Sequence, residues 1–409
     1  MQGFREGTPQ HREGSDCKIG TTTKEGTIRV CLQCLGAYSG IKDPEIEDEE
    51  RGRIVWSENA DKLKGSVEQA SPENCQICRG LFLNLHGMAD AAASDLEGYE
   101  FSSMLVGSKQ DEDSRMSETY LGEILGSEFD SVKKRFNRKF GKILEMKLNK
   151  AVNFQDPDII ITVDLQYLSF SYTIKSLYIG GTYLKKSRNL PQTRWIHTPL
   201  NDTNATVESI IGQALCDMAG GENYFLHGAG REDVDVMMLG NGREFILEVS
   251  NPRKRSIDLA HAAKLINLNN YGVEVSGLMF RSRDDVPLIK KAEHDKSYRA
   301  RVKSASVVNA AALESAVKAI SGKDIYQRTP LRVSTRRSDT VRVKKVRDVK
   351  LEWVSDDTFE ITVRAQSGTY IKELITGDGG RTVPSLSSEY GSPLEVLSLD
   401  VIWIHRDGE

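Results

Sequence analysis

The sequence predicts an α+β protein built from more than one domain. Its 409 residues exceed the length of a typical single domain, so we expect two to three domains. In the middle of the chain, a basic helical pattern is followed by alternating strand patterns, which together indicate a small α+β module. From about Trp195 onward, a larger set of helix and strand patterns follows. We therefore predict domains at residues 1–85, 86–195 and 196–409.

The composition favours a globular protein of the cytoplasm. Apolar residues make up 39% of the chain, which is enough for hydrophobic cores, and no run of about 18 apolar residues predicts a membrane span. The N-terminus has no apolar segment typical of a secretory signal, so we expect a cytoplasmic monomer without membrane contact. Because the net charge is −4, any binding of nucleic acid must depend on local basic patches.

Two pairs of cysteines near the N-terminus predict a metal site. The segments RVCLQCLG and ENCQICRG each hold a C-x-x-C pair, and a long charged stretch separates them. Each pair can bring two thiolates to one ion, so together they complete a tetrahedral zinc site of the structural kind. A pair of redox-active dithiols is the alternative. The predicted zinc ligands are Cys31, Cys34, Cys75 and Cys78.

A basic amphipathic helix is predicted over residues 128–150. Apolar residues recur there at intervals of three and four, which marks the face that packs against a core. The other face is almost entirely positive, so it either contacts phosphates or is simply solvated. Its residues are Lys133, Lys134, Arg135, Arg138, Lys139 and Lys142.

The segment after this helix combines strand patterns with a basic loop. PDIIITVDLQY is a short apolar run, and SFSYTIKSLYIGGTYLKK alternates as a strand does. Basic residues then alternate with aromatic ones up to Trp195, a composition that suits stacking on and charge pairing with RNA. The RNA-binding residues predicted here are Lys185, Arg188 and Arg194.

The stretch HGAGREDVDVMMLGNGREFILEV places charged residues on a glycine-flanked loop. Alternating apolar residues on both sides of Asn241-Gly242 predict a β-hairpin that turns at this dipeptide. Gly228 and Gly230 would let the preceding loop approach a ligand closely. The carboxylate of Asp233 is then either an ordinary turn residue or a catalytic group held on a rigid strand.

Two strands and a helix are predicted nearer the C-terminus. Residues 297–306 and 335–350 alternate as strands, and Val341, Val343 and Val346 of the second are expected to face the core. The basic residues of the second strand form either a phosphate track or a solvated face. The predicted phosphate contacts are Arg336, Arg337, Arg342 and Lys344.

The segment SGTYIKELIT predicts a strand that runs into a helix near Tyr370. Lys372 would lie in the first turn of this helix, where a cation opposes the helix dipole. A cation at such a place suggests a specific partner, and a carboxylate is the obvious one.

These motifs together resemble one family. PDI.I.VDL, SLYI.G.Y.K.SR..PQTRW and the basic helix are similar to the THUMP-containing accessory domain of archaeal tRNA pseudouridine synthases of the Pus-ten family. GREDVDV is similar to the segment with the nucleophilic aspartate, which falls on Asp233 and not on Asp235. GTYIK is similar to the segment that supplies its basic partner, which falls on Lys372.

Two softer correspondences complete the site that the resemblance implies. SYRA.V places the base-stacking tyrosine at Tyr298, with Tyr326 as a rival, and LSLDV places an apolar wall residue at Leu399. Arg231, two residues before the aspartate, would fill the space of the extruded base or hold a phosphate.

The resemblance implies fold, substrate and chemistry. The fold would be a zinc-binding and THUMP-containing N-terminal part followed by a pseudouridine synthase domain with a mixed, mainly antiparallel sheet. The substrate would be tRNA, modified at T-loop uridines 54 and 55, with attack at either the base C6 or the ribose C1′. Structural zinc is expected, but no organic cofactor, because the reaction needs neither energy nor redox chemistry.

Two other functions remain open from the sequence. The chain could be another THUMP-bearing enzyme of tRNA modification, although we find neither a G-x-G-x-x-G loop nor an S-G-G-x-D-S loop for the cofactors of such enzymes. It could also be a structured-RNA-binding protein without activity, but the combination of Asp233 and Lys372 argues against this.

Overall fold

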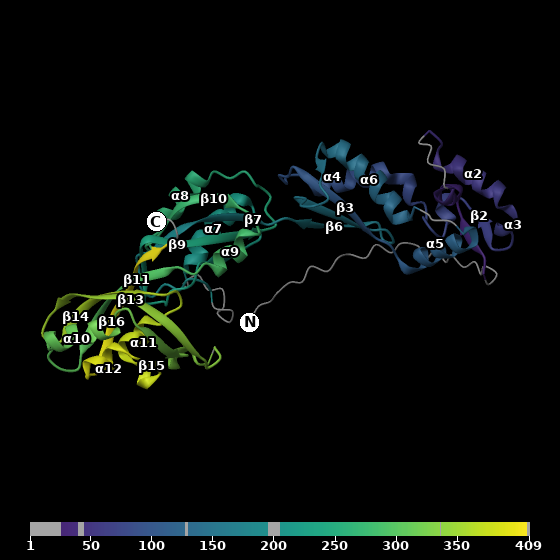
Figure 1. The fold of residues 1–409 in the computed structure, drawn as a ribbon. Helices are drawn as coiled ribbons and strands as arrows, with labels where there is room; N and C mark the ends of the chain where they lie inside the picture. The colour runs from purple at the N-terminus through teal and green to yellow at the C-terminus, as the bar shows by residue number, and fades with distance from the viewer. Residues whose placement is uncertain (1–25, 40–44, 127–129, 195–204, 336, 407–409) are drawn as a thin grey trace, which may run out of the picture. The chain divides into compact units, whose positions relative to one another are not determined.

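The structure is a computed structural model that describes residues 26–39, 45–126, 130–194, 205–335 and 337–406. These residues form two compact units (Figure 1). The described residues up to 96, with 105–154 and 160–172, make the first unit, and residues 97–104, 155–159 and those from 173 onward make the second. No helix in these described ranges is long and apolar enough to cross a membrane.

The first part of the first unit is small and built around the cysteines. Strands β1 and β2 pair in parallel, and short helices surround them. Helices α1 and α2 cross so closely that a Cβ atom added at Gly52 of α2 would lie 2.0 Å from the carbonyl oxygen of Leu32 in α1, so this crossing requires glycine. The elements are β1 (Ile28–Val30), α1 (Leu32–Leu35), α2 (Asp48–Glu58), α3 (Ala60–Leu63), β2 (Val67–Gln69) and α5 (Glu112–Leu125).

The rest of the first unit is a four-stranded sheet in the order β4-β3-β5-β6, with α4 and α6 packed together beside it. Phe136 and Phe140 of α6 stack with ring centres 5.0 Å apart, and Phe170 of β6 continues this aromatic row. The predicted helix at 128–150 is confirmed as α6. The elements are α4 (Leu85–Asp95), β3 (Ser103–Lys109), α6 (Val132–Leu148), β4 (Ala151–Val152), β5 (Ile159–Asp164) and β6 (Ser169–Ile174).

The second unit is organised by one long mixed sheet. Its strand order is β10-β7-β9-β16-β11-β14-β13-β12-β15, and β8 pairs with β9 beside this path. Apart from the parallel pair β9–β16, the neighbouring described strands are antiparallel, as the sequence predicted. The strands are β7 (Leu177–Lys185), β8 (Asn223–Gly228), β9 (Met237–Ser250), β10 (Val273–Arg281), β11 (Asp295–Ser304), β12 (Asp324–Arg328), β13 (Val341–Val354), β14 (Thr358–Ala365), β15 (Thr382–Val383) and β16 (Leu394–His405).

Helices pack along this sheet in two groups. Helix α7 contacts β8 and β9, and α8 contacts β10, whereas α10 contacts β13 and α11 contacts β16. A continuous hydrophobic cluster extends through both groups. The helices are α7 (Val207–Ala219), α8 (Leu259–Asn267), α9 (Asp285–Lys291), α10 (Ala310–Ile320), α11 (Ile371–Thr376) and α12 (Leu386–Tyr390).

The expected boundary between residues 195 and 196 is too late in the chain. Residues 177–185 form β7, which pairs with β9 on one side and with β10 on the other. This segment was assigned to the accessory domain because it follows other strand patterns directly. The choice of sheet depends on pairing partners that lie far along the chain, and these place it in the second unit.

The predicted hairpin at Asn241-Gly242 is wrong. Strand β9 runs through this dipeptide without reversing, and Gly240 and Gly242 adopt positive φ angles of 64° and 72° in a bulge. The side chain of Asn241 donates to the carbonyl oxygen of Ile404 (2.7 Å) and accepts from its amide (2.9 Å). Pairing of this kind with β16 holds the chain extended where the local sequence favours a turn.

The orientation expected for strand 335–350 is also partly wrong. Val346 is buried, but Val341 and Val343 are 60% and 55% exposed. The reason lies in the pairing, because β13 pairs with β14 only from Val346 onward. The earlier part of β13 pairs with β12 and presents Val341 and Val343 to solvent.

The bulge in β9 predicts a steric limit at Gly240. An added Cβ atom would lie 1.9 Å from the carbonyl oxygen of Ile402, so Gly240→Ala should strain both the φ angle and the packing. Gly322→Ala is the matched control, because Gly322 has a φ of 72° and open space around it. The control should lose about 1–2 kcal/mol of unfolding free energy. Gly240→Ala should lose about 1–3 kcal/mol more. Equal shifts of the two variants in chemical denaturation would contradict the close approach to β16.

Candidate active site and candidate metal centre

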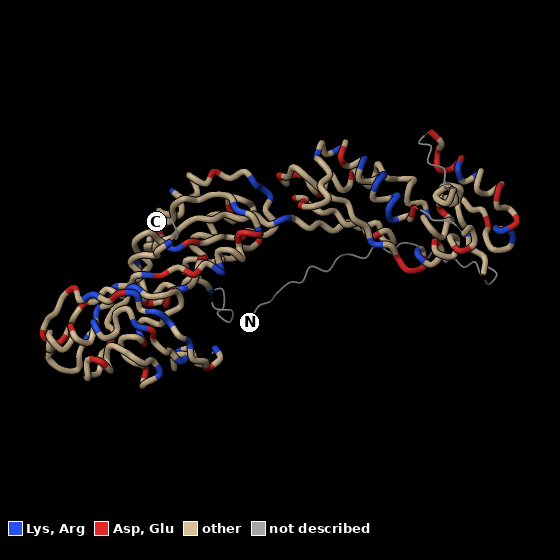
Figure 2. Tube along the Cα trace, in the orientation of Figure 1, with Lys and Arg blue, Asp and Glu red and all other residues tan. Residues whose placement is uncertain are grey.

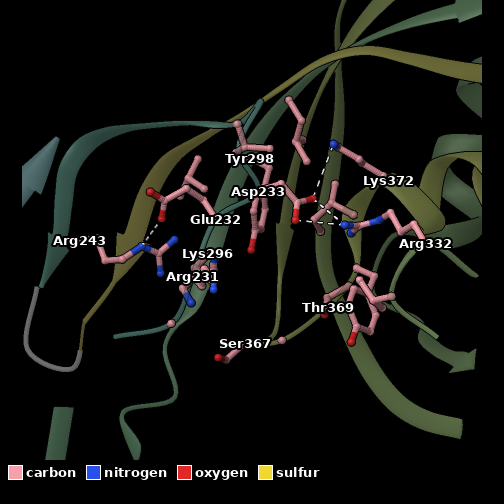
Figure 3. A pocket seen from close by; sticks show the side chains of 18 of the residues that line it. Arg231, Glu232, Asp233, Arg243, Lys296, Tyr298, Arg332, Ser367, Thr369 and Lys372 are labelled. Atoms are coloured by element: carbon pink, nitrogen blue, oxygen red, sulfur yellow. Dashed lines mark hydrogen bonds and ion pairs between the residues drawn. The ribbon is translucent and has the colours of Figure 1, made fainter. Parts of the chain in front are cut away.

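A cavity of about 310 Å³ lies in the second unit, between the loop before β9 and the segment leading into α11 (Figure 3). Side chains from β11 and β16 form its floor. The five residues that the sequence predicted as catalytic all line this cavity, although they come from four separate segments of the chain. They are Arg231, Asp233, Tyr298, Lys372 and Leu399.

Asp233 is held by two cations. Its carboxylate oxygens lie 2.9 and 3.0 Å from Nη1 of Arg332, and one of them lies 3.6 Å from Nζ of Lys372. The predicted partner Lys372 is therefore present, but Arg332 is closer. Arg332 lies in a 3-10 helix, Leu331–Val333, and a second carboxylate, Glu373, holds its Nε at 2.6 Å. No motif in the sequence pointed to Arg332.

Lys372 bridges two carboxylates. Its ammonium group lies 2.7 and 2.9 Å from the two carboxylate oxygens of Asp235, which is closer than its contact with Asp233. Partial burial raises the pKa of Asp235, but the hydrogen bond and the positive charge of Lys372, together with the charge of Arg332, lower it below its ordinary value. Asp233 lines the cavity, and Asp235 is not among the residues that line it.

Lys185 has a role different from the RNA contact that the sequence suggested. Its side chain is fully buried, and its ammonium group donates to the carbonyl oxygens of Leu190 (2.9 Å), Asp233 (3.2 Å) and Val234 (3.1 Å). Burial lowers its pKa, and the nearby Glu232 opposes this. The prediction that Lys185 binds RNA is therefore wrong, because an ammonium group enclosed by three carbonyls cannot reach a phosphate. It fixes the backbone of Asp233 instead.

A buried ion pair also holds the loop that carries Arg231 and Asp233. Nε of Arg243 lies 2.8 Å from a carboxylate oxygen of Glu232, and both side chains are almost completely buried. Tyr183 donates to Glu232 at 2.9 Å, and Gln192 donates to both the Tyr183 hydroxyl (2.8 Å) and the Gly230 carbonyl (3.1 Å). The backbone on either side of Arg231 is thus anchored by β7, β9 and the segment after β7.

The two arginines predicted near Lys185 differ from each other. Arg188 donates to the carbonyl oxygens of Asp235 (2.8 Å) and Leu399 (3.2 Å), and it pairs with Asp400 at 2.7 Å. Its guanidinium group is therefore engaged by contacts within the protein. Arg194 is exposed and lies over the ring of Tyr224, with its guanidinium carbon 5.0 Å from the ring centre.

The predicted phosphate track has unequal members. Arg337 is exposed, lines the cavity and donates to the Tyr370 hydroxyl at 2.9 Å. Arg342 and Lys344 are partly buried and donate to Thr329 Oγ1 (3.0 Å) and to the Ser367 carbonyl (2.8 Å). Arg336 lies outside the described residues.

The structure distinguishes the two candidate tyrosines by position. Tyr298 lines the cavity, and burial, opposed by Arg243, raises its pKa to about 12, so its phenol is protonated at neutral pH. Tyr326 is 56% exposed on β12 and does not line the cavity. Leu399 is buried and completes the wall on the β16 side.

The four predicted zinc ligands come together in the first unit. All four cysteines are buried, and their sulfur atoms lie within 4.8 Å of one another. The sulfurs of Cys31 and Cys78 are 3.6 Å apart, close to the separation of about 3.8 Å that a tetrahedral zinc ion with bonds of about 2.3 Å requires.

An arginine lies beside this cysteine cluster. Arg135 was expected on the basic face of α6, but it is only 3% exposed, so that expectation is wrong. Its Nη2 donates to the sulfur of Cys34 at 3.3 Å, and its Nη1 donates to the carbonyl oxygen of Gln33 at 2.7 Å. A buried guanidinium group facing sulfur atoms fits thiolates better than neutral thiols.

Two family models match the chain. A family model described as Pus10, C-terminal, matches residues 178–405, and one described as Pus10 THUMP domain, archaeal, matches residues 88–164. Among solved structures, a Cbf5–Nop10–Gar1 complex matches 48% of this chain and 44% of the other, at 15% identity and a TM-score of 0.31. A similarity of that size carries no argument about function.

Curated relatives match over nearly the full chain. A protein of Thermoplasma acidophilum named tRNA pseudouridine synthase Pus10 is 44% identical over 379 residues, which cover 92% of this chain and 97% of that protein. A protein of the same name from Picrophilus torridus is 42% identical over 381 residues, which cover 93% and 98%. The family models and these relatives together show that the chain belongs to the Pus10 family.

Proposed function

We propose that this tRNA pseudouridine synthase isomerises T-loop uridines 54 and 55, with Asp233 as its nucleophile. The observation that carries the proposal is the placement of Asp233 in the cavity, beside Arg332 and Lys372. The tRNA substrate rests on the names of the curated relatives. The two positions rest on the resemblance of GREDVDV and GTYIK to the corresponding motifs of the family.

The reaction moves one bond and one proton. The bond between ribose C1′ and uracil N1 breaks, the uracil turns, and a bond forms between C1′ and C5. The C5 proton is then lost and N1 gains a proton, so that no oxidant, reductant or energy source is consumed. A carboxylate can assist by adding to the base C6 or to the ribose C1′, and both sites are compatible with the position of Asp233.

The walls of the cavity suit an uncharged, detached uracil. Tyr298 and Leu399 offer an aromatic and an aliphatic surface, and Arg332 and Lys372 compensate the charge of Asp233. Such walls exclude water from an intermediate that must not escape. Arg231 lines the cavity, and its side chain has no hydrogen-bond or ion-pair partner within the described part of the chain. It is therefore free to fill the gap left by the extruded base.

The first unit is proposed to bind tRNA. Figure 2 shows basic residues along α6. Two of them form ion pairs, Lys139 with Asp48 (2.7 Å) and Arg138 with Asp130 (2.6 Å). Three others form no ion pair within the described ranges, namely Lys133, Lys134 and Lys142. Phosphate contact through these lysines would place RNA along the THUMP-containing module.

The cysteine cluster is proposed to hold one structural zinc ion. The sulfur spacing, the complete burial of four cysteines and the guanidinium group of Arg135 support it. The ion would join the β1–α1 segment to the segment between β2 and α4, and it would leave no position open for chemistry. Arg135 would orient Cys34 and offset the negative charge of the thiolates.

The nucleophile is tested by exchanging each aspartate for its amide. Asp233→Asn should reduce single-turnover pseudouridine formation on an unmodified tRNA transcript by at least about a hundredfold, because an amide has the shape but not the nucleophilicity of a carboxylate. Its affinity for tRNA should stay within a few-fold. Asp235→Asn should be slowed much less, since Asp235 lies outside the cavity. An active Asp233→Asn enzyme beside an inactive Asp235→Asn enzyme would reverse the assignment.

Lys185→Met tests whether this lysine supports the loop. The substitution removes the ammonium donor from the carbonyls of Leu190 and Val234, which should cost about 1–3 kcal/mol of stability. The Asp233 carbonyl loses the same donor but keeps the amide of Val236. The single-turnover rate should fall, while the dependence of tRNA affinity on salt stays unchanged. Lys186→Met is the control, because Lys186 is an exposed neighbour paired with Glu274. A flatter salt dependence for Lys185→Met alone would restore its predicted contact with RNA.

The zinc proposal predicts one zinc ion per chain in protein purified without chelator. Cys75→Ser should lose the metal and unfold the cysteine region, because structural zinc contributes on the order of 10 kcal/mol in small modules. Arg135→Met should keep the four ligands but weaken zinc binding by about 10–100-fold in a chelator competition. Arg138→Met, an exposed position one turn further along α6, is the control. Metal analysis without zinc, or equal affinities of the two arginine variants, would count against these roles.

A further inference from the structure

A buried lysine of the cavity has no role in the chemistry described above. Lys296 lies on β11 two residues before Tyr298, so that both side chains point to the same side of the sheet. It is 8% exposed and lines the cavity (Figure 3). Its ammonium group forms no hydrogen bond or ion pair with any residue that the structure describes. A buried cation without a partner is costly, so such a group points to a ligand.

The charged neighbours of Lys296 do not neutralise it. Burial and the adjacent Arg243 lower its pKa to about 8, and Glu232 only partly opposes them. The carboxylate of Glu232 already accepts from Arg243 and from Tyr183. The positive charge of Lys296 is therefore uncompensated inside the protein.

This end of the cavity carries an excess of positive charge, whereas the cations at the other end are matched in number by carboxylates in and around the cavity. Arg231, Arg243 and Lys296 face a single carboxylate, that of Glu232. At the other end, Asp233 lines the cavity with Arg332, Arg337 and Lys372, and two carboxylates outside the lining, Glu373 and Asp235, pair with Arg332 and Lys372. A nucleotide has the same asymmetry, because its base is neutral and its phosphate carries a negative charge.

A glycine leaves space in front of the cations. Gly230 has a φ of 90°, and a Cβ atom added to it would lie 3.3 Å from Nζ of Lys296 and 2.9 Å from Nη1 of Arg243. Because residue 230 is glycine, no side chain of this residue covers the two nitrogens on the side of the loop. A small anionic group can approach them there.

We propose that Lys296 binds a phosphate of the target nucleotide while its uracil lies against Asp233. The proposal rests on the proposed function and adds a phosphate subsite to the same cavity. Charge-assisted hydrogen bonds from the ammonium group would fix the ribose between the phosphate and the base. The sugar carbon C1′ would then stay in place while the detached uracil turns.

The test measures RNA binding rather than turnover. Stem-loops of the T arm carry a single neutral methylphosphonate on the 5′ or the 3′ side of the target uridine. Their affinities are measured for four proteins that all carry Asp233→Asn. One has no further substitution and is called the unchanged chain below, and the others add Lys296→Met, Lys296→Arg or Lys303→Met. Lys303 is an exposed lysine of the same strand and serves as the matched control.

Lys296→Met should bind the native stem-loop on the order of tenfold more weakly, with a salt slope lower by about one. Lys296→Arg should retain most of the affinity, and Lys303→Met should bind like the unchanged chain. At one of the two linkages, the methylphosphonate should weaken binding to the unchanged chain and abolish its advantage over Lys296→Met.

The proposal is overturned if Lys296→Met loses the same factor on every RNA, which would place the ammonium group against the base or the sugar. It is also overturned if neither methylphosphonate weakens binding to the unchanged chain, and that measurement needs no Lys296 variant to fold. Failure of the proposed function would appear in a separate activity measurement, as the absence of pseudouridine in tRNA treated with the protein that keeps Asp233.

Discussion

The buried pair of Glu232 and Arg243 is the interaction on which the site depends most. It joins the loop that carries Asp233 to β9, and both side chains are almost completely buried. Removing one partner of such a pair usually costs about 3–5 kcal/mol, because the other charge stays buried. With the ammonium group of Lys185 beneath the same loop, the backbone before and after Asp233 cannot move without exposing an unpaired charge. The carboxylate is thus held in place before any substrate arrives, which is the condition for efficient electrostatic catalysis.

The sequence predicted the elements and motifs that depend on local patterns. The periodic apolar residues of α6 gave a helix close to its observed limits, and the motif containing Asp233 led to a residue that lines the cavity. The twin cysteine pairs were equally informative, because their spacing carries the geometry of one site. Each of these inferences needed only a short stretch of the chain.

The failures share a physical cause. Lysine and arginine are rarely buried, so surface positions are expected for Lys185 and Arg135, but carbonyl and sulfur atoms from distant parts of the sequence compensate their charges. Arg332 contacts Asp233 across 99 positions, and Asn241 contacts Ile404 across 163. No local pattern contains such partners. The net charge of −4 also says little about RNA binding, because it does not reveal which of the cations are already occupied inside the protein.

The bulge at residues 240–242 has a practical consequence for engineering this chain. From the sequence, Asn241-Gly242 would be chosen as a tolerant turn in which to insert a label or a permuted terminus. In the folded chain, the same dipeptide sets the alignment of β9 against both β7 and β16. Side chains alternate along a strand with a period of two, so one added or deleted residue there would turn Arg243 from the interior toward the opposite face. The number of residues between Asp233 and Arg243 is therefore fixed by the architecture of the site.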